Sequence, residues 1–426
     1  AMMGFMGWAY KITGLNCFLF ALLNTSMPII LLTIANSDGV HVITKFFRQF
    51  RRLKDVKTAI EHTMESLLIP IFLTSITTIA AFLTMISSPL EPLIGYGICM
   101  SVGIAWAWIF SSLTLPAMIN IVSWNPKSFS ITKPSMLEKL ASFFSKIVTR
   151  FPVQTFSIGV LMVVLGGIGI QSINVDVNVA NFFKPGTEIR DSMDFMDREM
   201  SGTMDLRIRI EADVKDPRIL NGLDSIQSFI QENENISVTY SIADVVKQMH
   251  RSVMDDSLKY ESIPPTREKV NNLFTMYYMS GDHDGLSSMI DPDHKTTLIT
   301  SLSSIMSTED IFSLVRSITT YVEKHLFGAE KISITGMIVV IHDMVLMVIR
   351  SSLLSIAISV LLIGIITSIF FGRVTWGALS IIPLFSAVIL NFGLMGHFDI
   401  ALNHITAILS SIIIGVGVDF AIHYIS

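Results

Sequence analysis

The 426-residue chain has little charge for its length. Only 15% of its residues are Asp, Glu, Lys or Arg, whereas 51% are hydrophobic. A soluble globular protein carries roughly a quarter charged residues. The apolar residues lie in long runs, which excludes a water-soluble enzyme and a disordered chain. The sequence therefore predicts an integral membrane protein.

Cysteine is scarce, and the motifs of several common chemistries are missing. Cys17 and Cys99 are the only two cysteines, and both lie in apolar segments. Two such residues form no disulfide framework. The sequence has no GxxxxGKS or GxxxxGKT pattern, which excludes a P-loop motor driven by ATP. It also has no CxxC or HExxH pattern, and its histidines lack the spacing of a metal site. We expect no cofactor, no metal and no enzymatic activity.

The small amount of charge is unevenly distributed. Residues 171–345 hold 27 acidic and 16 basic side chains, whereas the rest of the chain holds 8 acidic and 14 basic ones. The chain as a whole has a net charge of −5. An acidic insert between apolar segments flanked by basic residues argues against nucleic acid as a partner. The lipid bilayer is the partner that this composition predicts.

Seven apolar windows are long enough to cross a bilayer, which takes about 20 residues. They are 17–43, 67–86, 94–122, 151–173, 353–371, 376–395 and 405–424. Residues 1–9 read as the tail of an earlier span, with no signal-peptide pattern before them. Because the chain begins and ends in apolar sequence, we expect a fragment whose partner is the rest of its own chain.

The short loops predict an orientation. Lys and Arg gather in the loop after the first window, in 124–150 and at Arg373. These loops share one side if the spans alternate, and the positive-inside rule makes that side cytoplasmic. The acidic segment 174–341 then falls on the extracytoplasmic side. We expect a multi-pass protein of the inner (cytoplasmic) membrane.

The acidic segment has the pattern of an α+β domain. Residues 206–212, 237–242, 297–303 and 332–334 have strand patterns, and 219–230 and 310–326 have helical spacing. Two βαβ units with a helical insertion give a ferredoxin-like sandwich. The predicted fold class is an α-helical polytopic membrane protein with an α+β ferredoxin-like extracytoplasmic porter domain. The predicted domains are a first bundle (1–123), a cytoplasmic linker (124–150), a span (151–173), the porter domain (174–341) and a second bundle (342–426).

The two ends of the chain share a repeat. Gly-x-x-Gly, Leu-Asn and an Asp with a nearby His occur in the same order near the start and near the end. The members are Gly4, Gly7, Leu15, Asn16, Asp38 and His41, then Gly393, Gly396, Leu402, Asn403, Asp419 and His423. Internal repeats of this kind are a transporter trait. The repeat predicts two related membrane bundles.

Asp38 and Asp419 are the strongest candidate site residues. Each lies in an apolar window, where a carboxylate costs on the order of 3 kcal/mol. Such a group usually faces the bundle interior, where it can take a proton from one side and release it to the other. His41 and His423 follow at helical spacing, so each shares a helix face with its aspartate. The alternative is that these residues sit near a helix end and are simply hydrated.

Small and polar residues surround both aspartates. Asn36 and Ser37 precede Asp38, and Gly415 and Gly417 precede Asp419. Small residues allow close approach of helices, which would bring both carboxyls into one cavity. A run of hydroxyls in the second window either joins this cavity or bonds back within its own helix; the run consists of Thr74, Ser75, Thr77 and Thr78.

These motifs together resemble MMPL-type exporters of the resistance-nodulation-division (RND) superfamily. The stretch 175–188 resembles the start of the family's second extracytoplasmic domain, and 277–282 and 334–336 resemble later landmarks. The Asp38 segment resembles the family's fourth span and the Asp419 segment its tenth. The resemblance implies a fragment that runs from the end of the third span through the tenth.

The resemblance also implies a mechanism. In such transporters, carboxylates of the fourth and tenth spans relay protons, and the outer domains export hydrophobic or lipid-like cargo. Carried over, the relay residues are Asp38 and Asp419, with His41 and His423 beside them. This chain has Phe420 where many members have Tyr, which removes a hydroxyl.

We therefore expect a transporter driven by the proton motive force that exports hydrophobic or lipid-like substrates across the inner membrane. The sequence leaves open whether the protein forms a homo-oligomer. One alternative is a lipid-binding or sterol-sensing-type receptor with the same fold and no pumping. The other is an accessory to protein translocation of the SecD/SecF type, which would associate with a secretion channel.

Overall fold

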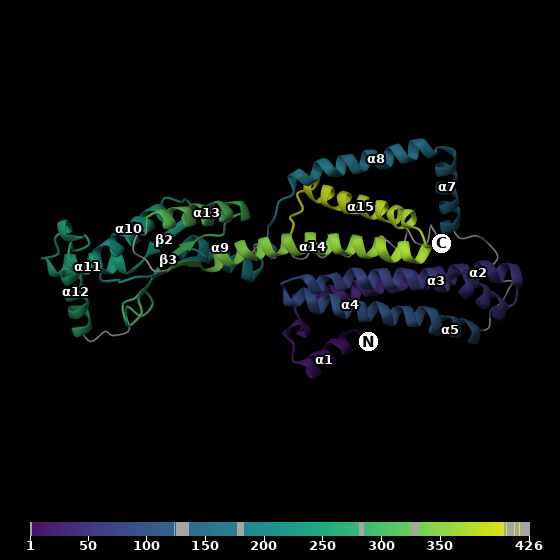
Figure 1. Cartoon of the computed structure of the whole chain (residues 1–426), viewed down its shortest axis with the longest axis horizontal. Coiled ribbons are helices and arrows are strands. Elements are labelled where there is room, and N and C mark those ends of the chain that lie inside the picture. The colour runs from purple at the N-terminus through teal and green to yellow at the C-terminus, as the bar shows by residue number, and fades with distance from the viewer. Residues whose placement is uncertain are drawn as a thin grey trace. The chain divides into compact units, whose positions relative to one another are not determined.

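The protein is described by a computed structural model that covers residues 2–122, 124, 136–176, 183–280, 285–325, 331–403, 406, 413 and 417. The chain divides into two compact units (Figure 1). The membrane unit consists of Ala1–Val175 and Met347–Ser426, and the α+β unit consists of Asp176–Leu346.

The membrane unit is built of helices. In chain order they are α1 (Met2–Thr13), α2 (Met27–Leu53), α3 (Val56–Leu83), η3 (Thr84–Ser87), α4 (Glu91–Ile109), η4 (Phe110–Thr114), α5 (Leu115–Ile121), α7 (Met136–Arg150), α8 (Pro152–Gly169), α14 (Met337–Phe371), which begins in the α+β unit, and α15 (Val374–His397). Within the described residues, six helical segments are long and apolar enough to cross a membrane. Each overlaps one of the first six predicted windows. The seventh window, 405–424, lies outside the described residues except for three positions.

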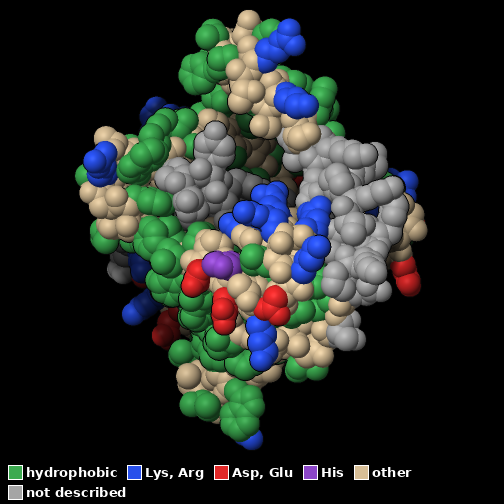
Figure 2. Space-filling model, turned by 90° about the vertical axis from the view of Figure 1, so that its right-hand side faces the viewer, with side chains coloured by type: hydrophobic (Ala, Val, Ile, Leu, Met, Phe, Trp, Pro, Cys, Tyr) green, Lys and Arg blue, Asp and Glu red, His purple; other side chains and the backbone are tan. Residues whose placement is uncertain are grey.

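The turn between α2 and α3 is fixed by local chemistry. Lys54 ends α2 in the left-handed conformation, with φ at 59°, and its N–H donates to the Phe50 carbonyl at 2.9 Å. Asp55 caps α3, because its carboxylate accepts from the Thr58 N–H at 2.9 Å. Arg51 and Arg52 in the last turn of α2 suit the negative end of its dipole. Figure 2 views this end of the molecule and shows Lys and Arg side chains gathered there.

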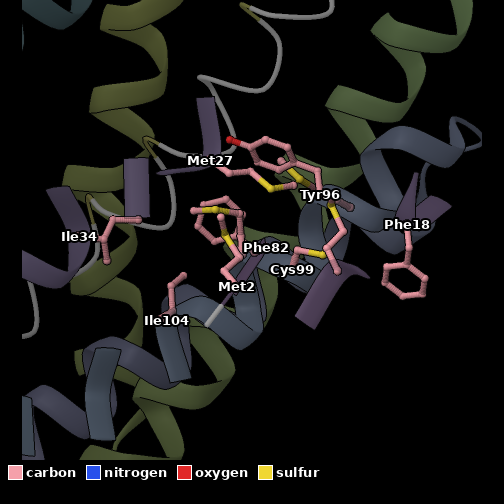
Figure 3. Close-up of a cluster of buried hydrophobic side chains, with 11 residues drawn as sticks. Met2, Phe18, Met27, Ile34, Phe82, Tyr96, Cys99 and Ile104 are labelled. Atoms are coloured by element: carbon pink, nitrogen blue, oxygen red, sulfur yellow. The ribbon is translucent and has the colours of Figure 1, made fainter. Parts of the chain in front are cut away.

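An apolar cluster holds α1 to α4 together (Figure 3). Met27, Phe82, Tyr96 and Met100 are its most deeply buried large side chains, with exposures of 1% or less. The Tyr96 hydroxyl lies 3.1 Å from the Ser26 hydroxyl, which satisfies the polar end of the ring. The cluster therefore closes this end of the bundle without leaving the tyrosine hydroxyl unpaired.

Helices α8 and α15 approach each other through glycines. Gly166 and Gly169 lie on α8, and Gly393 and Gly396 lie on α15. A Cβ at Gly393 would collide with the backbone of Gly166, and one at Gly396 would collide with the Gly169 carbonyl. Only glycine fits such a contact. The C-terminal Gly-x-x-Gly of the repeat thus has a packing role.

The α+β unit is a ferredoxin-like sandwich. Its elements are α9 (Glu188–Glu199), β1 (Met204–Glu211), α10 (Pro217–Gln231), β2 (Ile236–Tyr240), α11 (Ile242–Val253), α12 (Arg267–Met279), β3 (Thr296–Ser303), α13 (Thr308–His325) and β4 (Lys331–Thr335). The strand order is β2-β3-β1-β4, and every pair is antiparallel. This is the split βαβ arrangement, with α11 and α12 inserted between β2 and β3. The predicted helical membrane fold with an α+β ferredoxin-like domain is confirmed.

The sheet is amphipathic, as the period-two pattern requires. Leu206, Ile208 and Ile210 of β1 are fully buried, and the residues between them are partly or fully exposed. Successive strand residues point to opposite faces. Buried Leu220 and Leu223 belong to α10, which contacts β2 and β3. One face of the sheet is therefore in the core of the unit.

Candidate functional site in the membrane unit

Asp38 occupies a position that the helix otherwise fills with apolar side chains. The buried face of α2 advances in steps of four through Ile34, Asp38, Val42, Phe46 and Phe50. Asp38 is 8% exposed, and it is the only charged side chain that is buried within the described residues. The alternative of a hydrated carboxyl at a helix end does not match this burial, eleven residues into a 27-residue helix.

Two apolar clusters enclose Asp38 along the bundle. On α2, Ile34 belongs to the cluster shown in Figure 3 and Val42 belongs to a second cluster. On α3, Phe82 belongs to the first cluster and Ile71 to the second. Asp38 therefore lies in a polar layer between two hydrocarbon layers, where its charged form loses hydration.

Ser75 of α3 is the described partner of this carboxyl. Its hydroxyl donates a hydrogen bond to Asp38, and its side chain is 5% exposed. The neighbouring threonines instead donate to carbonyls of their own helix. Thr74 bonds to Ile71 O at 2.9 Å, Thr77 to Leu73 O at 2.9 Å, and Thr78 to Thr74 O at 2.8 Å. Of the two alternatives for this hydroxyl run, Ser75 follows one and the threonines follow the other.

A π-helical turn contacts α2 near the site, and sequence reasoning missed it. This turn, η4, spans Phe110–Thr114. Leu115 follows it and lies 3.9 Å from the place of a Cβ at Gly39. The Ser112 hydroxyl is buried and has no hydrogen-bond partner within the described residues. Pro116 is the signal in the sequence, because it lacks the N–H that an α-helix would pair with the carbonyl of Ser112.

The other candidate residues near Asp38 lie nearer the surface. Asn36 and His41 are exposed, and Ser37 is half-buried. The structure thus places Asp38 and Ser75 together inside the bundle and leaves Asn36 at its surface. His41 follows Asp38 by three residues but is not part of the buried face of α2.

Asp419, Phe420 and His423 lie outside the described residues. Gly417 is described, and a Cβ there would lie 3.3 Å from Leu384 Cδ1 of α15. Leu384 belongs to an apolar cluster with Leu73 of α3. Gly417, two residues before Asp419, therefore packs onto an apolar cluster that includes Leu73 of α3, the helix that carries Ser75.

Buried hydroxyls also join the two helix bundles. The Thr84 hydroxyl at the end of α3 lies 2.8 Å from the Ser355 hydroxyl and 2.9 Å from the Ser359 hydroxyl of α14. The Thr367 and Ser380 hydroxyls connect α14 to α15 at 3.0 Å. Within the part of the chain that the structure describes, no three His, Cys, Asp or Glu side chains gather as a metal site.

Family models match most of the chain. The MMPL family model matches residues 202–426. The Patched SSD model matches residues 4–121. The Patched SSD match extends over α1 to α5, and the MMPL match begins just before β1 and extends to residue 426. The segment 122–201 lies between the two matches.

Individual proteins from other organisms match parts of the chain. Over 84 residues, the chain is 32% identical to Protein dispatched homolog 3 of Gallus gallus. This match covers 20% of this chain and 6% of that protein. Over 214 residues, it is 22% identical to a putative membrane protein of Methanocaldococcus jannaschii, which covers 50% of this chain and 52% of that protein.

The fold is shared with proteins of known structure. The hedgehog release protein Disp from the water bear Hypsibius dujardini superposes with a TM-score of 0.63 at 12% sequence identity. The match covers 95% of this chain and 54% of that one, so this chain spans about half the length of Disp. Since the MMPL model alone covers more than half of its residues, the chain belongs to the MMPL family.

Proposed function

We propose that this chain is the proton-coupling part of a transporter that uses the proton motive force to export hydrophobic or lipid-like substrates across the inner membrane. The observation that carries the proposal is Asp38, a buried carboxyl in a long apolar helix whose described partner is a neutral hydroxyl. A buried charge without a counter-charge is expensive, so the group favours exchange between charged and neutral forms.

The second relay group is Asp419. The repeat gives it the place in the second bundle that Asp38 has in the first. Gly417 lies against Leu384, and Leu384 packs with Leu73 of α3, two residues from Ser75. This chain of contacts supports a shared site for both carboxyls. His41, His423, Asn36, Ser37 and Phe420 are proposed as neighbours that admit or hold water along the proton path.

In the proposed cycle, protons reach both aspartates from the extracytoplasmic side and leave to the cytoplasm. Neutral Asp38 no longer needs the Ser75 hydroxyl, so α2 and α3 gain freedom to rearrange. The buried hydroxyls of Thr84, Ser355 and Ser359 carry that rearrangement to α14. The α+β unit, on the extracytoplasmic side, then handles the cargo.

The test is transport by the full-length protein in liposomes with an imposed pH gradient. Asp38→Asn keeps the size of the side chain and its ability to accept from Ser75, but it cannot ionise. We expect near-complete loss of gradient-driven export, with no loss of thermal stability because a buried charge is removed. Asp419→Asn is expected to have the same effect.

Asp399→Asn is the matched control. Asp399 is exposed and has a φ of 52° after α15, a conformation that asparagine tolerates. This variant is expected to transport at the rate of the unaltered protein. Undiminished proton-coupled export by Asp38→Asn would contradict the proposal.

A second candidate function is a lipid-binding or sterol-sensing-type receptor. Two observations favour it: the Patched SSD match over 4–121, and an apolar cavity of about 500 Å³ between α1, α2 and α4. Leu31, Gly103 and Ala107 are among its lining residues. Ala107→Phe would narrow this cavity. A receptor predicts lower labelling by a photoreactive sterol in that variant and no effect of Asp38→Asn on labelling or signalling.

A further inference from the structure

An apolar cluster separates Asp38 from the end of the bundle where α2 turns into α3. It is the second of the two clusters that enclose Asp38, and its buried members are Val42, Phe46, Phe50, Ala59, Leu67, Ile71 and Ile119. The proposed orientation puts this turn on the cytoplasmic side. The site described below rests on the proposed function, in which a proton leaves Asp38 for the cytoplasm and therefore has to cross this cluster.

Hydrocarbon side chains neither donate nor accept hydrogen bonds, so a path through this region depends on its buried hydroxyls. Thr63, Thr74 and Ser111 donate to carbonyls of their own helices, at 2.6, 2.9 and 3.0 Å. Ser112 differs from these three, because its hydroxyl is buried and no described residue is hydrogen-bonded to it. Its hydroxyl is therefore available to a ligand.

The π turn η4 directs this hydroxyl into the bundle. Ser111 and Ser112 are the buried residues of the turn, with exposures of 5% and 6%. Phe110 and Leu113 of the same turn are exposed. The turn contacts α2, the helix that carries Asp38. The two serines are thus the polar side chains that η4 contributes to the interior of the membrane unit.

The contacts of the neighbouring residues give the level of Ser112 in the bundle. Leu115, three residues later, lies 3.9 Å from the place of a Cβ at Gly39, which follows Asp38 directly. Trp108 and Leu115, on either side of Ser112 in the sequence, both pack against the second cluster. Ser112 is therefore level with Asp38 to within about one helical turn, at the edge of the cluster that the proton has to cross.

The local backbone explains why Ser112 does not bond within its own helix. A serine in a helix commonly donates to the carbonyl four residues earlier, which here is that of Trp108. That carbonyl already accepts from Ser111 at 3.2 Å. Buried polar groups that find no protein partner are usually bonded to ordered water. Water also suits a hydroxyl, which can both donate and accept.

We propose that Ser112 binds a water molecule between the π turn and α2, and that this water takes the proton from Asp38 on its way to the cytoplasm. The O–H bond of the neutral carboxyl breaks and a new O–H bond forms on the water. The water then gives one of its protons to the cytoplasmic side, so it ends unchanged, and the carboxylate again accepts from Ser75. Ser112 is a positioning residue that holds the water and supplies no proton of its own.

The test is a sided pH jump on the full-length protein in liposomes. The Asp38 carboxyl is followed by the part of the infrared carbonyl band that Asp38→Asn removes. A rise of pH on the cytoplasmic side draws the proton from Asp38. In Ser112→Ala we expect this release to be about tenfold slower, which corresponds to the loss of one hydrogen bond in the transition state. A rise of pH on the extracytoplasmic side is expected to act at the unaltered rate.

Ser111→Ala is the matched control. Ser111 lies on the same turn and is buried to the same degree, but its hydroxyl bonds to carbonyls of its own helix. This variant is expected to release the proton at the unaltered rate. Equal release rates in Ser111→Ala and Ser112→Ala overturn the assignment of Ser112.

The water itself has a separate signature. Infrared difference spectra recorded in water enriched in heavy oxygen shift the O–H bands of bound water and leave those of serine hydroxyls in place. We expect a shifted band in the unaltered protein and in Ser111→Ala, and its loss in Ser112→Ala. A band that persists in Ser112→Ala overturns the water site.

Export by Asp38→Asn separates this site from the proposed function. Unaltered export in that variant refutes the proposed function, whatever the spectra of the serine variants show. If Asp38→Asn abolishes export while Ser112→Ala behaves as Ser111→Ala does, the proposed function stands and the role of Ser112 is overturned.

Discussion

The two units treat charged side chains in opposite ways. In the α+β unit, acids and bases pair with each other at the surface, as in Lys247 with Asp224 at 2.6 Å and Arg267 with Asp213 at 2.8 Å. In the membrane unit, the buried carboxyl of Asp38 meets the hydroxyl of Ser75. These charged side chains of the α+β unit are thus paired with opposite charges, whereas the buried Asp38 of the membrane unit faces a neutral hydroxyl.

This difference indicates why Asp38 is present. Exposed ion pairs contribute little to stability and are easily exchanged. A buried charge without a counter-charge lowers stability, and an apolar residue would pack better in its place. The fold gains no stability from a carboxyl between two hydrocarbon layers, and the proposed proton relay would give this carboxyl a role.

The largest expected effect tests the glycine contact between α8 and α15 in the membrane unit. In Gly393→Ala, the new Cβ would collide with the Gly166 backbone, so α8 and α15 must separate. We expect the free energy of unfolding to fall by about 3 kcal/mol or more. Thermal unfolding of the full-length protein in detergent measures it. Gly167→Ala has open space around its Cβ and serves as control; equal losses in both variants would contradict the glycine contact.

A smaller effect tests the hydroxyl contacts of the same unit. Thr84→Val keeps the shape of the side chain and removes the group that meets Ser355 and Ser359. The expected loss is about 1 kcal/mol. In the control Thr155→Val, the lost hydroxyl bonds only to Phe151 O of its own chain segment. The same thermal unfolding assay compares the two, and an equal or larger loss in the control would refute the interhelical role of Thr84.

The smallest effect tests the surface pairs of the α+β unit. Burial alone would lower the pKa of Lys247, but the hydrogen bonds and charges of Asp224 and Asp244 outweigh it and hold the pKa above its usual value. The stabilisation is therefore complete below the unfolded pKa of about 10.4 and lost only as the pH rises through the folded value.

Lys247→Gln is accordingly expected to destabilise α10 and α11 by about 0.5 kcal/mol. Hydrogen exchange of these helices in the full-length protein measures the change at pH 6 and pH 8. The difference from the unaltered protein is expected to be the same at both. Lys269→Gln provides a control on the neighbouring helix α12. A difference that changes between the two pH values would contradict the pairing.

The period-two segments predicted the sheet because burial on one face leaves a local trace in the sequence. The strand at 206–212 is found as Met204–Glu211, and the order of strands follows from two βαβ units. The apolar windows likewise predicted the six helical spans within the described residues. Both signals depend on neighbours in the sequence.

Features that depend on tertiary contacts were not predictable in this way. Four hydroxyls in 74–78 look alike in the sequence, and only the packing of α2 on α3 selects Ser75. The π turn that contains Ser112 was also missed, although Pro116 marks it locally. Helix α7 lies in a segment treated as a linker, although the spacing of Leu140, Phe143, Phe144 and Ile147 is helical. The place of Asp419 stays a prediction.

The proposed function depends most on whether the Asp38 carboxyl, between α2 and α3, changes protonation during transport. Infrared difference spectroscopy of the full-length protein, recorded as a pH gradient is applied with cargo present, detects the carbonyl stretch of a protonated carboxyl. The proposed relay predicts a band that appears in the unaltered protein, persists in Asp399→Asn and is weaker in Asp38→Asn, where Asp419 is the remaining relay carboxyl. A spectrum in which Asp38→Asn shows the same band as the unaltered protein would contradict it.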